Sequence, residues 1–364
     1  MDFQQNMAEG KLASFRIEDY DYELPPELIA QHPAPARELS RLLVLDRSAG
    51  TLRHSRFDKI GQYLRPGDLL VVNDTRVVPA RLVGRKETGG RVEFLVLDPY
   101  KDPELGETRG YRCLTKASKP VRQGQIIEFS EGIRAEVVSA SGDGLVQARF
   151  LGATQLVDLL DRIGRTPLPP YIERDAGAQS EGDLICYQTE YAKHPGAIAA
   201  PTAGLHFTKS LLHELGAAGI ELAALTLHVG YGTFSPIRCE DFRDHRMHSE
   251  YIEVGEASAR AINRAKGEKR RIVAVGTTVV RTLEWVFAQQ GEVRPFSGMC
   301  DHFIYPGYGF QVVDCMVTNF HVPKSSLILL VSAFAGRSQI ASAYREAVCE
   351  RYRFFSYGDA MLIL

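Results

Sequence analysis

The stretch Arg271–Trp285, RIVAVGTTVVRTLEW, decides the fold class. Its first five residues are mostly β-branched or small apolar side chains, a pattern that predicts a buried strand. The turn GTT at 276–278 follows, and the apolar periodicity after it predicts a helix over Thr278–Gln289. A buried strand that leads through a tight turn into a helix is typical of an α/β layer with a largely parallel sheet.

The same alternation continues on both sides of this stretch. Ser210–Gly219 has a helical pattern that ends at a glycine, and Glu221–Val229 is a β-rich run. Gly255–Lys266 has helical periodicity again. A last helix is predicted from apolar residues that recur on one helix face at Ile340, Ala343, Tyr344, Ala347 and Val348. We expect the strand candidate Arg41–Asp46 to belong to this layer too.

Residues 66–150 have a different pattern. Short β-rich runs follow one another, with Gly, Asp and Pro turn signals between them and no helical periodicity. The runs are Leu69–Asn73, Val77–Val83, Arg91–Leu97, Tyr111–Thr115, Gln125–Phe129, Ile133–Ser139 and Leu145–Phe150. Strands at this spacing predict a small barrel or sandwich. We therefore predict a large α/β domain, residues 1–65 and 151–364, that carries residues 66–150 as an inserted small β-barrel domain.

The composition excludes several classes of protein. The 364 residues suggest two or three domains, and 45% hydrophobic with 24% charged residues is ordinary for a soluble protein. The net charge of −2 excludes a histone-like polycation but leaves a local nucleic-acid-binding patch open. No apolar run approaches the ~20 residues that span a bilayer, and the N-terminus lacks a signal-peptide pattern. The six scattered cysteines favour reduced thiols, a cytoplasmic location and neither a zinc site nor a disulfide scaffold.

Two segments are locally basic. Residues 109–122 contain no acid, and their basic residues are Arg109, Arg112, Lys116, Lys119 and Arg122. Residues 260–271 contain six basic residues and one acid. Either segment could follow a phosphate backbone, or each could be an ordinary solvated surface.

Two segments combine glycine with histidine and are candidates for a site. Ala200–Thr208, APTAGLHFT, offers a glycine that permits close backbone approach and, at His206, an imidazole that titrates near neutral pH. Thr226–Pro236 is a strand that runs into a glycine turn, with His228 near its carboxyl end, where ligands gather in α/β sheets. An ordinary loop with a hydrogen-bonded histidine is the alternative for Ala200–Thr208.

An acid and an imidazole occur together in His245–Val254. If residues 247–254 form a strand, His248 and Glu250 share one face and could act as a base and its orienter. His245 and His248 also have a spacing seen in metal sites. A catalytic zinc needs three protein ligands, however, and no H-E-x-x-H motif accompanies them, so we expect no metal.

Three further segments have ligand-binding chemistry. The helix start at Gly276, Thr277 and Thr278 leaves N–H groups that suit an anion or a carboxylate, although Thr277 could simply cap the helix. Phe303–Tyr308 has tyrosines that could stack on a purine, or pack in the core. Thr318–Ser326 has a histidine and a lysine that could meet a phosphate or a carboxylate.

Several sequence segments, in the order in which they occur along the chain, together form a pattern that is specific for one protein family. They are Arg41–Asp46, Gly67–Leu82, Pro167–Ile172, Ala200–Thr208, Leu227–Phe234, His245–Glu250, Gly276–Glu284, Thr318–Ser326 and Tyr352–Leu362. This set resembles the S-adenosylmethionine:tRNA ribosyltransferase-isomerases of queuosine biosynthesis, over about Ile17–Leu364. The resemblance implies an α/β domain with an inserted β-barrel, and no metal.

The resemblance also implies the reaction. Such enzymes transfer and isomerise the ribosyl moiety of S-adenosylmethionine onto 7-aminomethyl-7-deazaguanine at the tRNA wobble position, giving epoxyqueuosine and releasing adenine and methionine. S-adenosylmethionine is then a co-substrate, tRNA is the partner, and no prosthetic group or membrane is involved.

Side-chain chemistry within the similar motifs suggests a role for each candidate. We expect proton transfer from His206, His228, His248 and Glu250. We expect substrate binding by Asp74, Arg76, Thr202, Gly204, Thr208, Gly230, Gly276, Thr277, Thr278, Arg281, Tyr305, Asn319, His321 and Lys324. We expect RNA binding by Arg109, Arg112, Lys116, Lys119 and Arg122.

Three other functions remain open. An S-adenosylmethionine-dependent RNA methyltransferase would release S-adenosylhomocysteine, but the chain lacks an early glycine-rich loop after a first strand. A non-catalytic RNA-binding protein would bind tRNA without consuming S-adenosylmethionine, and it leaves the clustered His and Glu residues unexplained. A metal hydrolase that uses His245 and His248 would be sensitive to chelators.

Overall fold

A nine-stranded mixed sheet forms the body of the molecule. The structure is a computed structural model, and it describes residues 15–99, 110–152, 155–174, 181–234 and 237–364. In spatial order the strands of the sheet are β15 (Phe296–Cys300), β13 (Glu250–Val254), β12 (Glu221–Leu227), β3 (Leu69–Asn73), β14 (Ile272–Val275), β16 (Cys315–Asn319), β17 (Ala360–Ile363), β1 (Arg41–Asp46) and β2 (Thr51–Arg56). The central strands β12, β3, β14 and β16 are parallel, but β13, β15, β17 and β2 add antiparallel pairs. The sheet is therefore mixed, with one parallel group at its centre and a second parallel pair, β17 and β1, nearer one edge.

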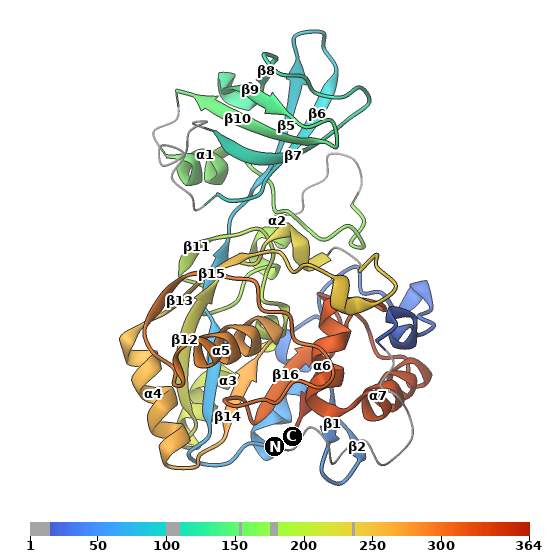
Figure 1. Ribbon diagram of the computed structural model, residues 1–364, viewed down its shortest axis with the longest axis vertical. Coiled ribbons are helices and arrows are strands. Elements are labelled where there is room, and N and C mark those ends of the chain that lie inside the picture. The colour runs from blue at the N-terminus through green and yellow to red at the C-terminus, as the bar shows by residue number, and fades with distance from the viewer. Residues whose placement is uncertain (1–14, 100–109, 153–154, 175–180, 235–236) are drawn as a thin grey trace.

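Helices cover both faces of this sheet (Figure 1). They are α3 (Lys209–Ala217), α4 (Glu256–Gly267), α5 (Thr277–Gln290), α6 (Ser326–Ala335) and α7 (Arg337–Cys349), whereas the short helix α2 (Glu181–Cys186) lies between the sheet and the barrel. Side chains of β3 alternate between two hydrophobic cores: Leu69 and Val71 pack on the side of α4–α7, and Leu70 and Val72 pack on the side of α3. The predicted strand–turn–helix unit is confirmed as β14 and α5, and the last predicted helix as α7.

The second unit is a closed six-stranded barrel that lies at one end of the molecule (Figure 1). In spatial order its strands are β10 (Leu145–Leu151), β7 (Tyr111–Ala117), β6 (Arg91–Val96), β5 (Arg81–Lys86), β8 (Ile126–Glu128) and β9 (Arg134–Ala140). Phe94 is fully buried in its core, and α1 (Leu156–Ile163) packs Leu159 and Leu160 against the same core. The α/β body with a small β-barrel confirms the predicted fold class.

The membership of two segments differs from the prediction. Leu69–Asn73 is not a barrel strand, because it is β3 at the centre of the large sheet. β4 (Thr75–Val77) pairs with β11 (His194–Ala197) in a separate two-stranded sheet. The division into two domains stays a prediction. We propose that the inserted domain starts after Val77 rather than at residue 66, and that it includes α1 rather than ending at residue 150.

The length and apolar composition of the helices were compared with those of membrane-spanning helices. Among the described residues, no single helix is long and apolar enough to cross a membrane. The helices α6 and α7 reach that length and composition only as a pair, with a bend of 114° between them.

Candidate active site at the carboxyl ends of the central strands

Polar and imidazole side chains lie together at one edge of the large sheet. The strands β12, β3, β14 and β16 are parallel, so their carboxyl ends meet there. The strands β1 and β17 run in the opposite direction and bring their first residues to the same edge. The residues that border these strand ends are Ser40, Asn73, His228, Gly276, Asn319 and Asp359. Ligands in open α/β sheets bind at such carboxyl ends.

A cavity of about 320 Å³ lies at this edge. The predicted site residues that line it are Thr202, Gly276, Thr277, Thr278, Asn319 and His321. Apolar and aromatic side chains, among them Tyr171, Phe320 and Phe355, form much of the remaining wall. Among the described residues, no Asp, Glu, Lys or Arg side chain lines the cavity. An apolar wall with a few polar groups is the usual character of a small-molecule site.

The start of α5 forms part of the cavity wall. Gly276 is the N-cap and has φ 92°, a conformation that side-chain-bearing residues rarely adopt. Thr277 is the first helical residue, so the alternative that it caps the helix is wrong. The first N–H groups of a helix have no intrahelical partner. The helix start therefore provides hydrogen-bond donors at this wall.

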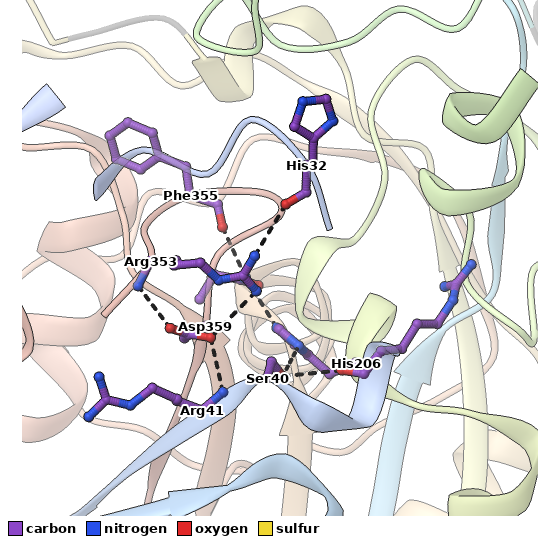
Figure 2. A network of polar contacts seen from close by, with 9 residues as sticks. His32, Ser40, Arg41, His206, Arg353, Phe355 and Asp359 are labelled. Carbon is purple, nitrogen blue, oxygen red and sulfur yellow. Dashed lines mark hydrogen bonds and ion pairs between the residues drawn. The ribbon is translucent and has the colours of Figure 1, made fainter. Parts of the chain in front are cut away.

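His206 is buried beside the cavity, and both of its ring nitrogens are engaged (Figure 2). Nδ1 lies 2.7 Å from Ser40 Oγ, and Nε2 lies 3.2 Å from Asn319 Nδ2. Asn319 Nδ2 also donates to the Phe355 carbonyl oxygen, so it presents a hydrogen to Nε2; Nε2 then accepts, and Nδ1 donates to Ser40 Oγ, which donates to the Arg37 carbonyl oxygen. Burial, with a smaller effect from Arg353, lowers the pKa of His206 to about 3. The ring is therefore neutral and held in one tautomer.

Asp359 anchors the neighbouring loop in the same network (Figure 2). Its carboxylate accepts hydrogen bonds from the backbone N–H groups of Arg41 and Arg353, at 2.9 and 2.8 Å. The guanidinium of Arg353 lies 3.6 Å from the same carboxylate and donates to the His32 carbonyl oxygen. These contacts fix the chain that leads from Arg353 to Phe355 at the cavity wall.

Asn319 connects His206 to this loop. Its Nδ2 donates to His206 Nε2 and to the Phe355 carbonyl oxygen, the latter at 3.1 Å. Both amide hydrogens are then used. Its Oδ1 is buried and has no partner within the described parts of the chain. Asn319 lines the cavity, and its Oδ1 is a buried acceptor without a hydrogen-bond donor in the described chain.

His321 is a second neutral imidazole at the cavity. Its Nε2 lies 2.8 Å from Thr318 Oγ1, and its backbone N–H donates to Tyr344 Oη. Burial lowers the pKa of His321 to about 3. Lys324 does not join it, because its Nζ pairs with Asp21 at 2.9 Å on the surface.

His228 is near the cavity but does not line it, although the next residue, Val229, does. Its Nδ1 lies 2.8 Å from Thr75 Oγ1, and its ring stacks on Tyr251 with 5.5 Å between ring centroids. Burial lowers the pKa of His228 to about 4, with a contribution from His194. His228 is therefore neutral at pH 7.

Glu250 forms a buried ion pair with Arg281 on α5. Glu250 Oε1 also accepts the backbone N–H of Gly230 at 2.9 Å, and Arg281 Nε donates to the His302 carbonyl oxygen at 3.0 Å. Within the described chain, Arg281 Nη2 has no hydrogen-bond partner. The predicted strand over 247–254 begins only at Glu250, so His248 is exposed and does not share a strand face with Glu250.

Other predicted substrate-binding residues have structural contacts away from the cavity. Gly204 is approached by Tyr191 rather than by a ligand, since a Cβ there would lie 2.1 Å from Tyr191 Oη. Thr208 is the N-cap of α3 and accepts from the Leu211 N–H at 3.2 Å.

The three remaining substrate-binding predictions also have protein partners. Asp74 accepts from Thr226 Oγ1 at 2.7 Å, and Arg76 pairs with Asp161 on α1 at 3.4 Å. Tyr305 packs on Phe242 with 5.4 Å between ring centroids. None of the three lines the cavity.

The two basic segments differ in their ion pairing. Arg109 lies outside the described residues. Arg112 lies 3.5 Å from Asp98, whereas Lys116, Lys119 and Arg122 are exposed on the barrel with no ion pair to a described carboxylate. In the other segment, side chains pair with described acids, as in Arg264–Glu221 and Arg271–Asp68.

Sequence reasoning assigned no role to Ser40 or to Phe355. Ser40 stands in no motif, and its contact with His206 joins segments 166 residues apart. Phe355 lies in the similar segment Tyr352–Leu362, but its φ of 70°, uncommon for a non-glycine residue, is visible only in the structure. Among the described residues, no group of three or more His, Cys, Asp or Glu side chains is arranged to hold a metal ion.

Comparison with known proteins extends over almost the whole chain. The family described as queuosine biosynthesis protein matches residues 17–363. Proteins named S-adenosylmethionine:tRNA ribosyltransferase-isomerase are 51% identical in Geotalea uraniireducens, over 96% of this chain and 99% of that protein, and 50% identical in Syntrophotalea carbinolica, over 96% and 100%. The crystal structure of S-adenosylmethionine tRNA ribosyltransferase from Thermotoga maritima is 37% identical, covers 95% of this chain and all of that chain, and has a TM-score of 0.54. This chain therefore belongs to the queuosine biosynthesis protein family.

Proposed function

We propose that this chain is an S-adenosylmethionine:tRNA ribosyltransferase-isomerase. It transfers and isomerises the ribosyl moiety of S-adenosylmethionine onto 7-aminomethyl-7-deazaguanine at the tRNA wobble position, forms epoxyqueuosine, and releases adenine and methionine. The observation that carries the proposal is the identity of about half of all residues with relatives of that name over nearly their full length. Because its substrate is tRNA, we also propose a cytoplasmic location.

The proposed reaction requires proton transfers near a purine. The sulfonium of S-adenosylmethionine acidifies the ribose 5′ carbon, so a base can remove a proton there. Adenine leaves more readily when it is protonated, and the tRNA amine attacks only when it is neutral. A neutral, water-poor cavity with nearby imidazoles supports such steps better than an exposed surface does.

Of the four residues first considered for proton transfer, His228 fits this role best. The pKa of His206 is lowered further than that of His228, His248 is exposed, and Glu250 is held by Arg281. His228 is neutral at pH 7 and follows β12 next to the cavity wall. We expect His228→Gln to lower the rate of epoxyqueuosine formation by roughly 10²–10⁴. A loss below tenfold, with the circular dichroism spectrum unchanged, removes His228 from the catalytic residues.

The exposed barrel cations support contact with tRNA. Lys116, Lys119 and Arg122 lie on and just after β7 and form no ion pair with a described carboxylate, although Glu93 on β6 stands opposite Lys116. Arg112 belongs to the same strand but has Asp98 as a neighbour. We propose that this face of the barrel binds the phosphate backbone of the tRNA.

A product assay tests the function directly. The protein is incubated with S-adenosylmethionine and tRNA that carries 7-aminomethyl-7-deazaguanine, with tRNA lacking that base as the control. Equal amounts of adenine, methionine and epoxyqueuosine are expected, and only with the modified tRNA. S-adenosylhomocysteine would indicate a methyltransferase, and tRNA binding without consumption of S-adenosylmethionine would indicate a binding protein. Loss of activity with a chelator would indicate a metal enzyme.

A further inference from the structure

We propose that the cavity receives the adenine base of S-adenosylmethionine, that Asn319 Oδ1 accepts a hydrogen bond from the 6-amino group of adenine, and that His206 is the positioning residue that holds Asn319 in this orientation. The inference rests on the proposed function, because that function supplies the ligand. It names which part of the ligand the cavity binds.

The charge of the cavity favours the base over the amino acid part. S-adenosylmethionine carries a carboxylate, an ammonium and a sulfonium at one end and a neutral purine at the other. A buried charge is costly unless it is paired, and no Asp, Glu, Lys or Arg side chain from the described part of the chain lines the cavity. Tyr171, Phe320 and Val322 instead give apolar walls that suit a flat, neutral ring. The purine is the matching end.

The hydrogen bonds of Asn319 decide which atom is available to a ligand. An amide nitrogen has two hydrogens, and here they are directed to His206 Nε2 and to the Phe355 carbonyl oxygen. Oδ1 is then the side-chain atom without a partner in the described chain, although Asn319 is only 2% exposed. Buried acceptors in native proteins nearly always have a donor. A ligand with an N–H group would provide it.

His206 helps to set the direction of the Asn319 amide. The NH₂ group lies between two acceptors, the Phe355 carbonyl oxygen at 3.1 Å and His206 Nε2 at 3.2 Å. A carbonyl oxygen can only accept, so the NH₂ group faces this side and Oδ1 points away from both. A ring protonated at Nε2 would present a second donor to the NH₂ group and disfavour this orientation. The orientation of Asn319 therefore depends on the Phe355 carbonyl and on the tautomer of His206 together.

This arrangement predicts discrimination at position 6 of the purine. Adenine has an amino donor there, purine has no group, and hypoxanthine has an oxygen acceptor that would face Oδ1. Inhibition constants of adenosine, purine riboside and inosine are measured against S-adenosylmethionine, in the presence of precursor tRNA. Adenosine is expected to bind about five- to tenfold more tightly than purine riboside, the effect of one hydrogen bond, and inosine is expected to bind most weakly.

Variants assign this discrimination to Asn319 and His206. In Asn319→Leu the preference for adenosine over purine riboside should fall below twofold. His206→Leu removes one of the two acceptors that hold the Asn319 amide and should lower the preference, whereas His206→Gln, whose side-chain oxygen can still accept from Asn319, should keep more of it. Asn263→Leu is the matched control, because Asn263 is a half-buried asparagine on α4 that bonds the backbone of Val293 away from the cavity.

The outcomes separate this inference from the proposed function. If the parent protein releases adenine from S-adenosylmethionine but does not distinguish adenosine from purine riboside, the inference is wrong and the function stands. Full discrimination in Asn319→Leu also overturns it. If Asn319→Leu does not fold, the pair His206→Leu and His206→Gln decides, since equal preferences in the two contradict the positioning role. No adenine release in the parent protein contradicts the function itself.

Discussion

Burial, rather than any neighbouring charge, is the main reason that the imidazoles around the cavity are neutral. His206 and His321 have pKa values lowered to about 3, and His228 to about 4. Neutral imidazoles donate from one nitrogen and accept at the other, so each ring can fix the direction of a neighbouring group. Histidine at this site can thus orient hydrogen bonds, in addition to the proton transfer that we propose for His228.

The low pKa of His206 predicts a loss of stability in acid. The unfolded ring has an ordinary pKa near 6.5, so the unfolded state binds more protons than the native state between pH 6.5 and about 3. Stability therefore falls as the pH falls through this window. We expect His206→Gln to remove about 2 kcal/mol of the difference in unfolding free energy between pH 7 and pH 5. Urea unfolding at both pH values measures it.

The control for this prediction is His213→Gln, because His213 is exposed on α3. Its substitution should leave the pH dependence of the unfolding free energy unchanged. If His206→Gln also has the pH dependence of the parent protein, His206 is not a buried neutral ring.

The Glu250–Arg281 ion pair predicts a large and coupled effect on stability. Both side chains are almost fully buried, at 4% exposed each. Removing one charge leaves the other buried without its partner, so we expect Glu250→Gln to lower the unfolding free energy by about 3–5 kcal/mol. The double variant Glu250→Gln with Arg281→Met should cost less than the sum of the single variants.

An exposed pair serves as the comparison for this cycle. Arg294 and Glu292 are half exposed or more, and Arg294→Gln should change the unfolding free energy by less than about 1 kcal/mol. Denaturant titration of all four variants provides the measurement. Additive effects of Glu250→Gln and Arg281→Met would contradict the buried pair.

Sequence motifs identified residues that the fold brings together, but not the direction of their side chains. Thr202, Asn319 and His321 line one cavity, and their part in binding a ligand stays a prediction. Gly204 and Thr208 come from the same motif as Thr202, yet Gly204 packs closely against Tyr191 and Thr208 caps the start of α3. A sequence motif indicates which residues lie near one another in the folded chain. The backbone dihedral angles, which the sequence does not display, decide where each side chain points.

At the level of elements, apolar strands carry too little information to assign them to a sheet. Leu69–Asn73 was grouped with the barrel because it precedes the other β-rich runs directly. It is fully buried on both faces, as central strands of an α/β sheet are, and this property distinguishes it from the barrel strands with their alternating burial. Helices α5 and α7 were predicted correctly because their apolar periodicity is long and regular.

The N-cap of α3 gives a prediction for an element. Thr208 Oγ1 accepts from the N–H of Leu211 and replaces a missing helical hydrogen bond. We expect Thr208→Ala to lower the unfolding free energy by about 1 kcal/mol, while Thr208→Ser keeps most of the stability. Thermal unfolding measures both. If Thr208→Ala instead raises the Michaelis constant for S-adenosylmethionine with stability unchanged, Thr208 binds substrate as the motif first suggested.

For the whole molecule, net charge conceals how charges are distributed. Most basic residues of segment 260–271 form ion pairs with described acids of the α/β body, such as Glu221, Glu268 and Asp68. These cations are therefore already neutralised by the protein. Lys116, Lys119 and Arg122 on the barrel have no described carboxylate partner. A chain with a net charge of only −2 thus still has a cationic face on its inserted unit.

This distribution predicts a steep effect of salt on tRNA binding. Each phosphate that a protein cation neutralises releases counterions, so the logarithm of the binding constant falls by about 0.7–0.9 for each tenfold rise in salt. We expect the triple variant Lys116→Gln, Lys119→Gln, Arg122→Gln to reduce this slope by about 2–3, measured by fluorescence anisotropy with precursor tRNA from 50 to 300 mM salt. Arg264→Gln, which removes a cation paired with Glu221, should leave the slope unchanged. A slope near zero in the parent protein would contradict electrostatic binding, and an equal slope in the triple variant would place the tRNA on another face.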